Sequence, residues 1–267
     1  MFRYAMGTAE VFSGIEAEPM MKYTYLLVDL GTIIIPFLFS FHPRLNFHKT
    51  WPSFFPAVAI TALLFIIWDS YFTSLGVWGF NEQYLTGVTI GNLPLEEVLF
   101  FVCIPYSCVF TYHCLNILVN RFPASGEKII TPVFITFLAI IGILHFNKLY
   151  TSYTFISFAL LLIASRYIFK VTWLHKFYWV YALLLIPFLI VNGILTGTGL
   201  EDPVVWYNNE ENLGIRIGTI PVEDIFYGME LILLNLLIFD FFKSRRSSRK
   251  RLQQAKTSIS LERQNEA

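Results

Sequence analysis

Long, continuous apolar runs dominate the chain and predict helices that cross a membrane. A helix rises about 1.5 Å per residue, so about 20 apolar residues span a hydrocarbon core roughly 30 Å thick. Seven segments approach or exceed this length: 23–41, 52–70, 93–119, 129–146, 151–169, 177–196 and 221–242. Their apolar residues do not alternate with polar ones, which argues against a strand barrel. The pattern predicts an all-α polytopic membrane protein with seven transmembrane helices.

The composition agrees with this pattern. Of the 267 residues, 55% are hydrophobic and only 14% are charged, against about 25% charged in soluble domains. The formal net charge is zero, which argues against a nucleic-acid partner, because such proteins carry basic stripes. The three cysteines lie in one apolar stretch and indicate no disulfide framework. The five histidines lie near the ends of the predicted spans, without the spacing of metal ligands, so no metal site is expected.

Basic residues in the loops predict the orientation, because Lys and Arg favour the cytoplasmic side. One side, after spans 1, 3, 5 and 7, carries Arg44, Lys49, Arg121, Lys128, Lys170, Lys176 and the tail residues Lys243, Arg245, Arg246, Arg249, Lys250 and Arg251. The other side carries Arg3, Lys22, Lys148 and Arg216. We therefore expect an inner-membrane protein with its N-terminus outside. Residues 1–20 are expected to be an extension, and residues 243–267 a cytoplasmic tail.

The chain contains an internal repeat. A single shift of the sequence against itself, without a gap, aligns His48-Lys49 with His175-Lys176 and Ile90-Gly91 with Ile217-Gly218. Such a match indicates two copies of one structural unit, here residues 21–120 and 148–242. A single linking span within 121–147 restores the orientation of the second copy, so the sequence predicts two parallel three-helix repeats rather than inverted ones.

An acidic motif opens the last span of each repeat: Pro94-Leu95-Glu96-Glu97 and Pro221-Val222-Glu223-Asp224. One interpretation is a plain helix start, because proline suits a first turn and acids there offset the helix dipole by about 0.3–1 kcal/mol. The other is a functional site. The motif occurs twice at matched positions, between apolar residues, and acids within a membrane usually serve a site.

Proton transfer is the chemistry that such acids suit best. A buried acid beside a second one can stay protonated near neutral pH and donate a proton, while another carboxylate acts as a base. Aromatic faces nearby can stabilise a carbocation. Three further polar residues, Asp69, Asn192 and Glu230, can either orient an acid or bridge helices.

These residues resemble the membrane lycopene cyclases of the bacterial heterodimeric and fungal fused type. The resemblance rests on both acidic motifs, Trp68-Asp69, Val77-Trp78-Gly79-Phe80-Asn81 and Ile215-Arg216-Ile217-Gly218-Thr219-Ile220-Pro221, and covers nearly all of 21–242. It implies an intramolecular lyase-type isomerase that closes the ends of lycopene and related linear carotenoids into β-ionone rings, giving γ- and then β-carotene. No cofactor is expected, since the chain has no Gly-x-Gly-x-x-Gly dinucleotide motif.

The resemblance assigns importance to the two acidic motifs as a whole, and the choice among their acids is our own inference. The expected catalytic acids are Glu96, Glu97, Glu223 and Asp224, with Glu96 and Glu223 preferred as the groups that are Glu in both copies. The residues expected to bind or orient substrate are Asp69, Trp78, Asn81, Asn192, Asn208, Arg216 and Glu230. We expect one composite site between the repeats, although each motif serving its own substrate end stays an alternative. Two other functions stay open: a carotenoid-binding membrane protein without activity, and a proton-coupled carrier.

Overall fold

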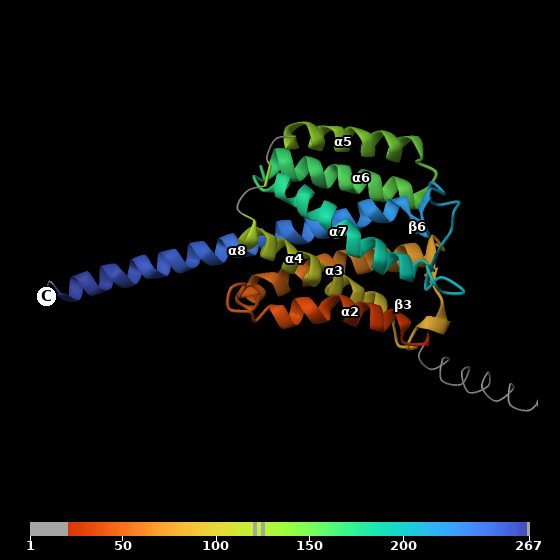
Figure 1. Cartoon of the computed structure of the whole chain (residues 1–267). Helices are drawn as coiled ribbons and strands as arrows, with labels where there is room; N and C mark the ends of the chain where they lie inside the picture. The colour runs from red at the N-terminus through yellow and green to blue at the C-terminus, as the bar shows by residue number, and fades with distance from the viewer. Residues whose placement is uncertain (1–20, 120–121, 124–125, 266–267) are drawn as a thin grey trace, which may run out of the picture.

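The structure is a computed structural model that describes residues 21–119, 122–123 and 126–265; it is a helical bundle with short strands at one end (Figure 1). The predicted extension, residues 1–20, lies outside the described residues. The helices are α2 (Thr24–Phe39), α3 (Trp51–Ser74), α4 (Leu95–Leu118), α5 (Glu127–Leu144), α6 (Leu149–Ile163), α7 (Leu174–Leu195) and α8 (Val222–Asn265). Short 3-10 segments, Phe47–Thr50 and Glu82–Tyr84, precede α3 and follow β1 (Trp78–Phe80).

Each predicted span overlaps one of these helices, although most of the helix ends differ by a few residues from the predicted ones. Six helical segments of the described chain are long and apolar enough to cross a membrane, and α2 is a shorter apolar helix of 16 residues. Helix α6 continues into a single π-helical turn at Ala164–Ile168. Helix α8 does not stop near residue 242 but continues through the predicted tail, far beyond the bundle (Figure 1).

Two β-hairpins that the sequence pattern did not predict precede α4 and α8. Strand β2 (Thr89–Ile90) pairs with β3 (Leu93–Pro94), and β5 (Arg216–Ile217) pairs with β6 (Ile220–Pro221). Both prolines therefore lie in strands, and the expectation that they occupy the first helical turn is wrong. Pro94 has an extended ψ of 150° and caps α4, which begins at Leu95, so Glu96 and Glu97 still lie in the first turn.

A third strand pair joins the two repeats. Strand β1 pairs antiparallel with β4 (Val205–Tyr207). Hydrogen bonds extend the pairing on both sides: the Asn81 N–H donates to the Val204 carbonyl at 2.9 Å, and the Asn208 N–H donates to the Val77 carbonyl at 2.9 Å. In the repeat alignment Asn208 is the counterpart of Asn81, and Val204 is the counterpart of Val77. The two halves therefore meet in a reciprocal, two-fold arrangement.

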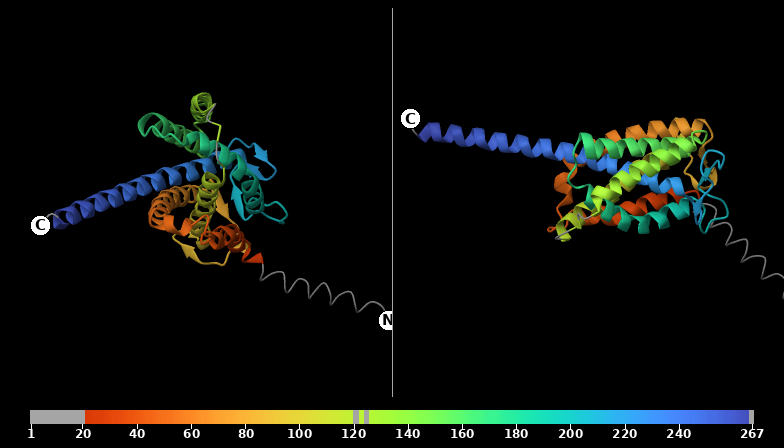
Figure 2. Two further views of the ribbon diagram at one scale, coloured as in Figure 1. Left: turned by 60° about the vertical axis from the view of Figure 1, so that its left-hand side comes forward. Right: turned by 90° about the horizontal axis from the view of Figure 1, so that it is seen from above.

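The helices of the two repeats interlock. Within each repeat the first and last helices pack together, α2 with α4 and α6 with α8. Between repeats, α3 packs on α8 and α7 packs on α4. Helices α4 and α8 both begin at the strand end of the bundle, so the repeats run parallel (Figures 1 and 2). Buried aromatic side chains such as Phe54, Phe101 and Phe158 fill the main core between them.

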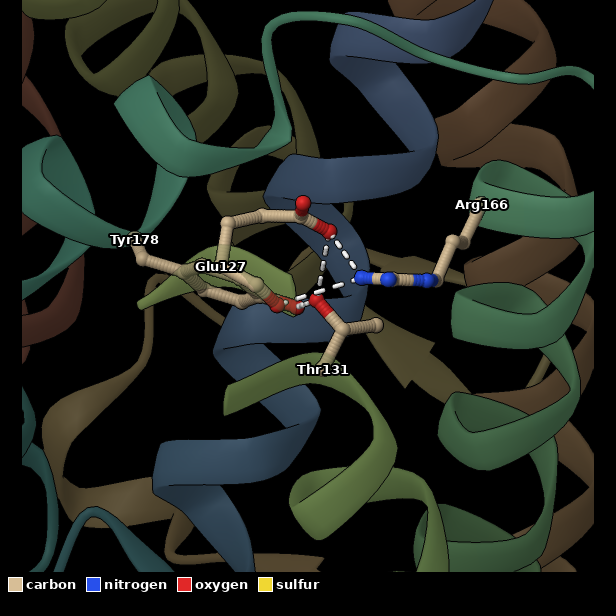
Figure 3. Close-up of polar contacts among 4 residues, drawn as sticks. All are labelled: Glu127, Thr131, Arg166 and Tyr178. Carbon is tan, nitrogen blue, oxygen red and sulfur yellow. Dashed lines mark hydrogen bonds and ion pairs between the residues drawn. The ribbon is translucent and has the colours of Figure 1, made fainter. Parts of the chain in front are cut away.

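The linking helix α5 lies on the outside of the bundle, against α6 (Figures 1 and 2). Its first turn is anchored at the end opposite the strands. There the Arg166 guanidinium forms an ion pair with Glu127, and Thr131 hydrogen-bonds to the Tyr178 hydroxyl at 2.8 Å (Figure 3). This polar cluster ties α5 to α6 and α7, and the acidic motifs lie at the other end of the bundle.

Candidate active site

A cavity of about 930 Å³ lies between α2, α4, α7 and α8. This volume is in the range of small-molecule binding sites. Most of the lining side chains are apolar, and the carboxyl groups among them belong to Asp69, Glu97 and Asp224. The lining comes from both repeats, so neither repeat forms the cavity alone.

The second acid of each motif faces the cavity, and each accepts a hydrogen bond from a buried tyrosine. The Tyr25 hydroxyl donates to Glu97 Oε2 at 2.5 Å, and the Tyr150 hydroxyl donates to Asp224 Oδ1 at 2.5 Å. Each tyrosine lies near the start of the first helix of its own repeat. The two repeats thus build the same contact twice, and all four side chains line the cavity.

Asp224 accepts two more hydrogen bonds. The Asn192 amide donates to its Oδ2 at 2.6 Å, and the Tyr207 hydroxyl donates to the same oxygen at 3.0 Å. Burial, and then the neighbouring Asp224 carboxylate, raise the pKa of Tyr207 well above its usual value. Tyr207 therefore keeps its proton and remains a donor at neutral pH. These contacts fix the Asp224 carboxylate from three sides.

The first acid of each motif points away from the cavity. Glu96 Oε1 accepts the Thr86 backbone N–H at 2.7 Å, and Glu223 Oε1 accepts the Leu213 backbone N–H at 2.7 Å. The two bonds occupy equivalent positions in the two repeats. Glu223 also accepts the Thr151 hydroxyl at 2.6 Å. Both glutamates are fully buried, and neither lines the cavity; they attach the preceding loops to the helix starts.

The geometry of a helix explains this division. Consecutive residues are about 100° apart around a helix with 3.6 residues per turn, so neighbouring acids face different surroundings. In both motifs the first acid turns towards its own loop and the second towards the cavity. Glu96 and Glu223, which were preferred from the sequence, are thus separated from the cavity that Glu97 and Asp224 share.

Aromatic rings surround the acid end of the cavity. Trp78 packs edge-on against Tyr150 with ring centroids 5.1 Å apart, and Tyr150 stacks on Tyr207 at 5.8 Å. Tyr227 contacts Trp78 at 6.3 Å and Tyr150 at 6.2 Å. The Trp78 indole N–H donates to Asp69 Oδ1 at 2.5 Å, which holds both side chains in place. All these side chains line the cavity, so its acid end is a box of aromatic faces and carboxyl groups.

Comparison with protein-family models shows to which family the chain belongs. The model described as "Lycopene cyclase" matches residues 22–115 and 147–242, which is more than half of the chain. The chain belongs to the lycopene cyclase family. The gap between the two matched segments contains α5, so the lycopene cyclase family model covers the two three-helix units and leaves out the helix that links them.

Curated relatives of this lycopene cyclase family member are fungal. The "Bifunctional lycopene cyclase/phytoene synthase" of Phaeosphaeria nodorum is 33% identical over 96 residues, covering 36% of this chain and 15% of that protein. The proteins of the same name from Pyrenophora tritici-repentis and Leptosphaeria maculans are each 31% identical over 102 residues, covering 36% of this chain and 17% of each relative. The matched segment is thus less than a fifth of these relatives' length. No solved structure gives a significant match.

Four of the expected substrate-orienting residues do not line the cavity of this family member: Asn81, Asn208, Arg216 and Glu230. The Asn81 and Asn208 side chains accept the backbone N–H two residues ahead, from Gln83 at 3.1 Å and Glu210 at 3.0 Å. These are local turn contacts, repeated in both halves.

The side chains of Arg216 and Glu230 form hydrogen bonds outside the cavity. Arg216 donates to the Thr219 carbonyl at 2.6 Å, within its own hairpin, and to the Asn209 side chain at 2.9 Å, in the loop before that hairpin. Glu230, buried in α8, accepts the Ser157 hydroxyl at 2.9 Å. By contrast Asp69, Trp78 and Asn192 do line the cavity. Of the seven residues expected to orient substrate, these three are therefore in a position to contact a molecule in the cavity.

Three polar side chains near the acids were not predicted from the sequence. Two are the tyrosines Tyr25 and Tyr150 described above. The third is Asp29 in α2, which is fully buried, and both of its carboxyl oxygens lack a hydrogen-bond partner among the described residues. A lone carboxyl within a predicted span is itself a signal, because such residues are costly in a membrane. It could have drawn attention to Asp29.

Proposed function

We propose that this chain is a lycopene cyclase that converts linear carotenoids into products with β-ionone rings, as an isomerase that uses acid–base chemistry. The observation that carries the proposal is the pair of carboxyl groups, Glu97 and Asp224, in one apolar cavity with aromatic walls. Family membership supports the substrate class. A long apolar groove suits a hydrocarbon substrate, and the acids supply the reactive groups that such a substrate lacks.

The proposed reaction conserves all atoms of the substrate. One carboxylic acid donates its proton to the terminal double bond, which leaves a carbocation. The neighbouring internal double bond attacks this cation, forming the new ring bond and moving the positive charge into the ring. A carboxylate then removes a ring proton, and the electron pair of that C–H bond becomes the ring double bond. One proton is gained and one is lost, so the product is an isomer and no redox partner is needed.

We assign the two proton transfers to Glu97 and Asp224. Asp224 accepts hydrogen bonds from Tyr150, Asn192 and Tyr207, and hydrogen bonds to a carboxylate favour its ionised form. Asp224 is therefore the proposed base. Glu97, which accepts a hydrogen bond from Tyr25 and has none of the other contacts, is the proposed acid. In this scheme Glu96 and Glu223 position the helix starts and do not touch substrate.

In this proposal the aromatic side chains of the cavity stabilise the carbocation. A ring face within about 6 Å attracts a positive charge, and the effect grows to about 2 kcal/mol where water is excluded. Trp78, Tyr150, Tyr207 and Tyr227 line the acid end. They would stabilise the cation between the two proton transfers, while Asp69 and Asn192 keep neighbouring side chains in position.

For the orientation in the membrane we propose that the strand end faces outside. Lys22, Lys148 and Arg216 are the described basic residues at this end. The opposite end carries Arg44, Lys49, Lys128, Lys170 and Lys176 together with the basic stretch of α8. Basic residues favour the cytoplasmic side, so α8 would enter the cytoplasm and the acid pairs would lie near the outer surface.

The test of the proposed activity is expression in bacteria that accumulate lycopene, followed by separation of the pigments. We expect monocyclic or bicyclic products with β rings and a change from red to orange-yellow. The Glu97→Gln variant, expressed to the same membrane level, is the matched control and should leave the red pigment. Unchanged lycopene in cells that contain the folded protein would contradict the proposal and favour a carotenoid-binding protein.

The buried tyrosines give a second test. Tyr25→Phe and Tyr150→Phe each remove one hydrogen bond to a cavity carboxylate. Each bond stabilises the ionised form of its carboxyl group, which Asp224 has as the proposed base and Glu97 acquires as it gives up its proton. Since a hydrogen bond to a charged group contributes about 1.5–3 kcal/mol, we expect each variant to cyclise roughly tenfold more slowly or worse. The measurement is the initial rate of ring formation in isolated membranes. The exposed tyrosines Tyr23 and Tyr153, at the same ends of these two helices, provide Tyr23→Phe and Tyr153→Phe as controls; equal losses in the controls would contradict the assigned role.

A further inference from the structure

The cavity is shorter than the molecule that it is proposed to bind. Along α4 its lining runs from Glu97 to Thr111, and this length of helix corresponds to about 21 Å at about 1.5 Å per residue. Along α2 the lining reaches from Tyr25, beside the acids, to Pro36, which is about 17 Å by the same measure. The two ends of an extended linear carotenoid are farther apart than either length. When one end lies at the acids, the other end must therefore lie outside the cavity.

The acids are confined to one end of the cavity. The carboxyl side chains of the lining belong to Asp69, Glu97 and Asp224, which lie near the ends of α3, α4 and α8 that adjoin the strands. The farther lining is mostly apolar, with a few hydroxyl and thiol groups and no carboxyl group. The cavity can therefore act on only one end of a bound molecule at a time.

The cavity opens sideways to the outer surface of the bundle. Four of its lining residues are exposed: Leu27, Gly31 and Ile35 in α2, and Pro187 in α7. The other lining residues are buried or half-buried. The three positions in α2 are four residues apart and so lie on one face of that helix. We call these four residues the lateral opening.

The lateral opening faces lipid when the bundle is in a membrane. Gly31 lies near the middle of α2, an apolar helix, and its neighbours Leu30 and Ile34 are 49% and 55% exposed. Gly31 has no side chain, and open space lies where one would start. A hydrocarbon chain can therefore pass beside α2 between the cavity and the acyl chains of the bilayer without crossing a polar layer.

From this geometry we infer that a linear carotenoid enters through the lateral opening and is bound by one half, with its far end left in the bilayer; the inference rests on the proposed function. The protein then contacts the end at the acids and the adjoining chain, and nothing in it contacts the far end. The second end reacts only after the molecule has left, turned round and returned. The structure of the far end, whether open, closed or bulky, should therefore not affect ring closure at the near end.

The first test varies the far end of the substrate and leaves the protein unmodified. Membranes that contain the chain are loaded with equal amounts of lycopene, a monocyclic carotenoid, or a linear carotenoid with a bulky ester at one terminus. We expect the same initial rate of ring closure per open end for all three. A cavity that enclosed the whole molecule would reject the ester, since added bulk in an apolar pocket typically costs about tenfold or more. Such a rejection would overturn the inference alone, whereas absence of any cyclic product from lycopene would overturn the proposed function and the inference with it.

The second test narrows the lateral opening. Gly31→Ala, Gly31→Leu and Gly31→Trp add side chains of increasing size at an exposed position with open space around it, and alanine and leucine favour helix, so the fold should persist. We expect ring closure to slow in that order, by about tenfold or more for tryptophan, and equally for lycopene and for a monocyclic carotenoid. Leu30→Trp is the matched control, because Leu30 is exposed on the same helix and does not line the cavity; it should leave the rate unchanged.

Unfolding temperatures separate a blocked opening from a damaged fold. We expect the Gly31 variants and Leu30→Trp to unfold at similar temperatures in detergent, while only the Gly31 variants lose activity. If the tryptophan protein does not fold, Gly31→Leu serves for the same comparison. Unchanged rates in all folded Gly31 variants would mean that lipid alone occupies the lateral opening, and would overturn the inference.

Discussion

Replacing Glu97 by Gln, or Asp224 by Asn, is expected to abolish cyclisation at both ends of lycopene. Both carboxyl groups line the same cavity, so both are available to one bound end and each proton transfer needs its own partner. Loss of a general acid or base typically costs about 10²- to 10⁴-fold in rate, and we expect a loss of this size in each variant. The measurement is the amount of linear, monocyclic and bicyclic carotenoid formed by equal amounts of membrane protein.

The pattern of products decides between one shared site and two separate ones. If each motif served its own substrate end, each single variant would accumulate a one-ringed product. Glu82→Gln and Glu210→Gln are matched controls, because both acids are exposed at the same end of the molecule, Glu82 in the 3-10 segment and Glu210 in a turn. They should retain the activity of the unmodified chain. A one-ringed product in both single variants of the cavity acids would contradict the shared site.

Replacing Glu223 by Ala is expected to reduce stability, and by more than the equivalent replacement of Glu96 does. It removes the acceptor for the Leu213 backbone N–H and for the Thr151 hydroxyl. Leaving a buried donor without an acceptor costs about 1–3 kcal/mol, so the loss of two contacts is large against the roughly 5–15 kcal/mol that holds a typical protein folded. Glu96→Ala removes one such contact, with Thr86, and should cost about half as much. Thermal unfolding of the purified proteins in detergent measures both.

Glutamine variants separate this structural role from a chemical one. Glu96→Gln and Glu223→Gln keep an oxygen that can accept the backbone N–H, so we expect near-normal unfolding temperatures and substantial cyclisation. Thr151→Val removes only one of the two contacts of Glu223 and should fall between Glu223→Gln and Glu223→Ala in stability. Normal folding together with complete loss of cyclisation in the glutamine variants would make Glu96 and Glu223 the proton donors, as preferred from the sequence.

The sequence predicted where the acids lie but not which of them reach the cavity. The acidic motifs and their repeat spacing were visible because each recurs in an apolar context. The choice within each motif was not visible, since Glu96 and Glu97 are adjacent and the same ambiguity recurs at Glu223 and Asp224. Which acid faces the cavity depends on how the preceding loop folds back on the helix start. In each repeat the loop donates a backbone N–H, from Thr86 or Leu213, to the first acid of the motif.

The tyrosines that donate to the cavity acids could not be predicted, for a different reason. Tyr25 and Tyr150 make equivalent contacts, but the gap-free repeat alignment places Tyr25 opposite Ser152 and not opposite Tyr150. The repeat comparison therefore could not pair them. The apolar helices were predictable because length and hydropathy determine them almost alone. The strand pairs have only two or three residues on each side, too few for a periodic signal, and β1 finds its partner far along the chain.

The construction of one cavity from helices of both repeats has a consequence for how the protein is made. Glu97 is synthesised a whole repeat before Asp224, and at about 5–20 residues per second the ribosome needs roughly 6–25 s for that interval. Throughout this time α4 lacks the wall that α7 and α8 later provide, and we expect lipid tails to fill the open side of the growing chain. The cavity is completed only when the last helix docks, so maturation should require that lipid leaves the space which the substrate afterwards enters.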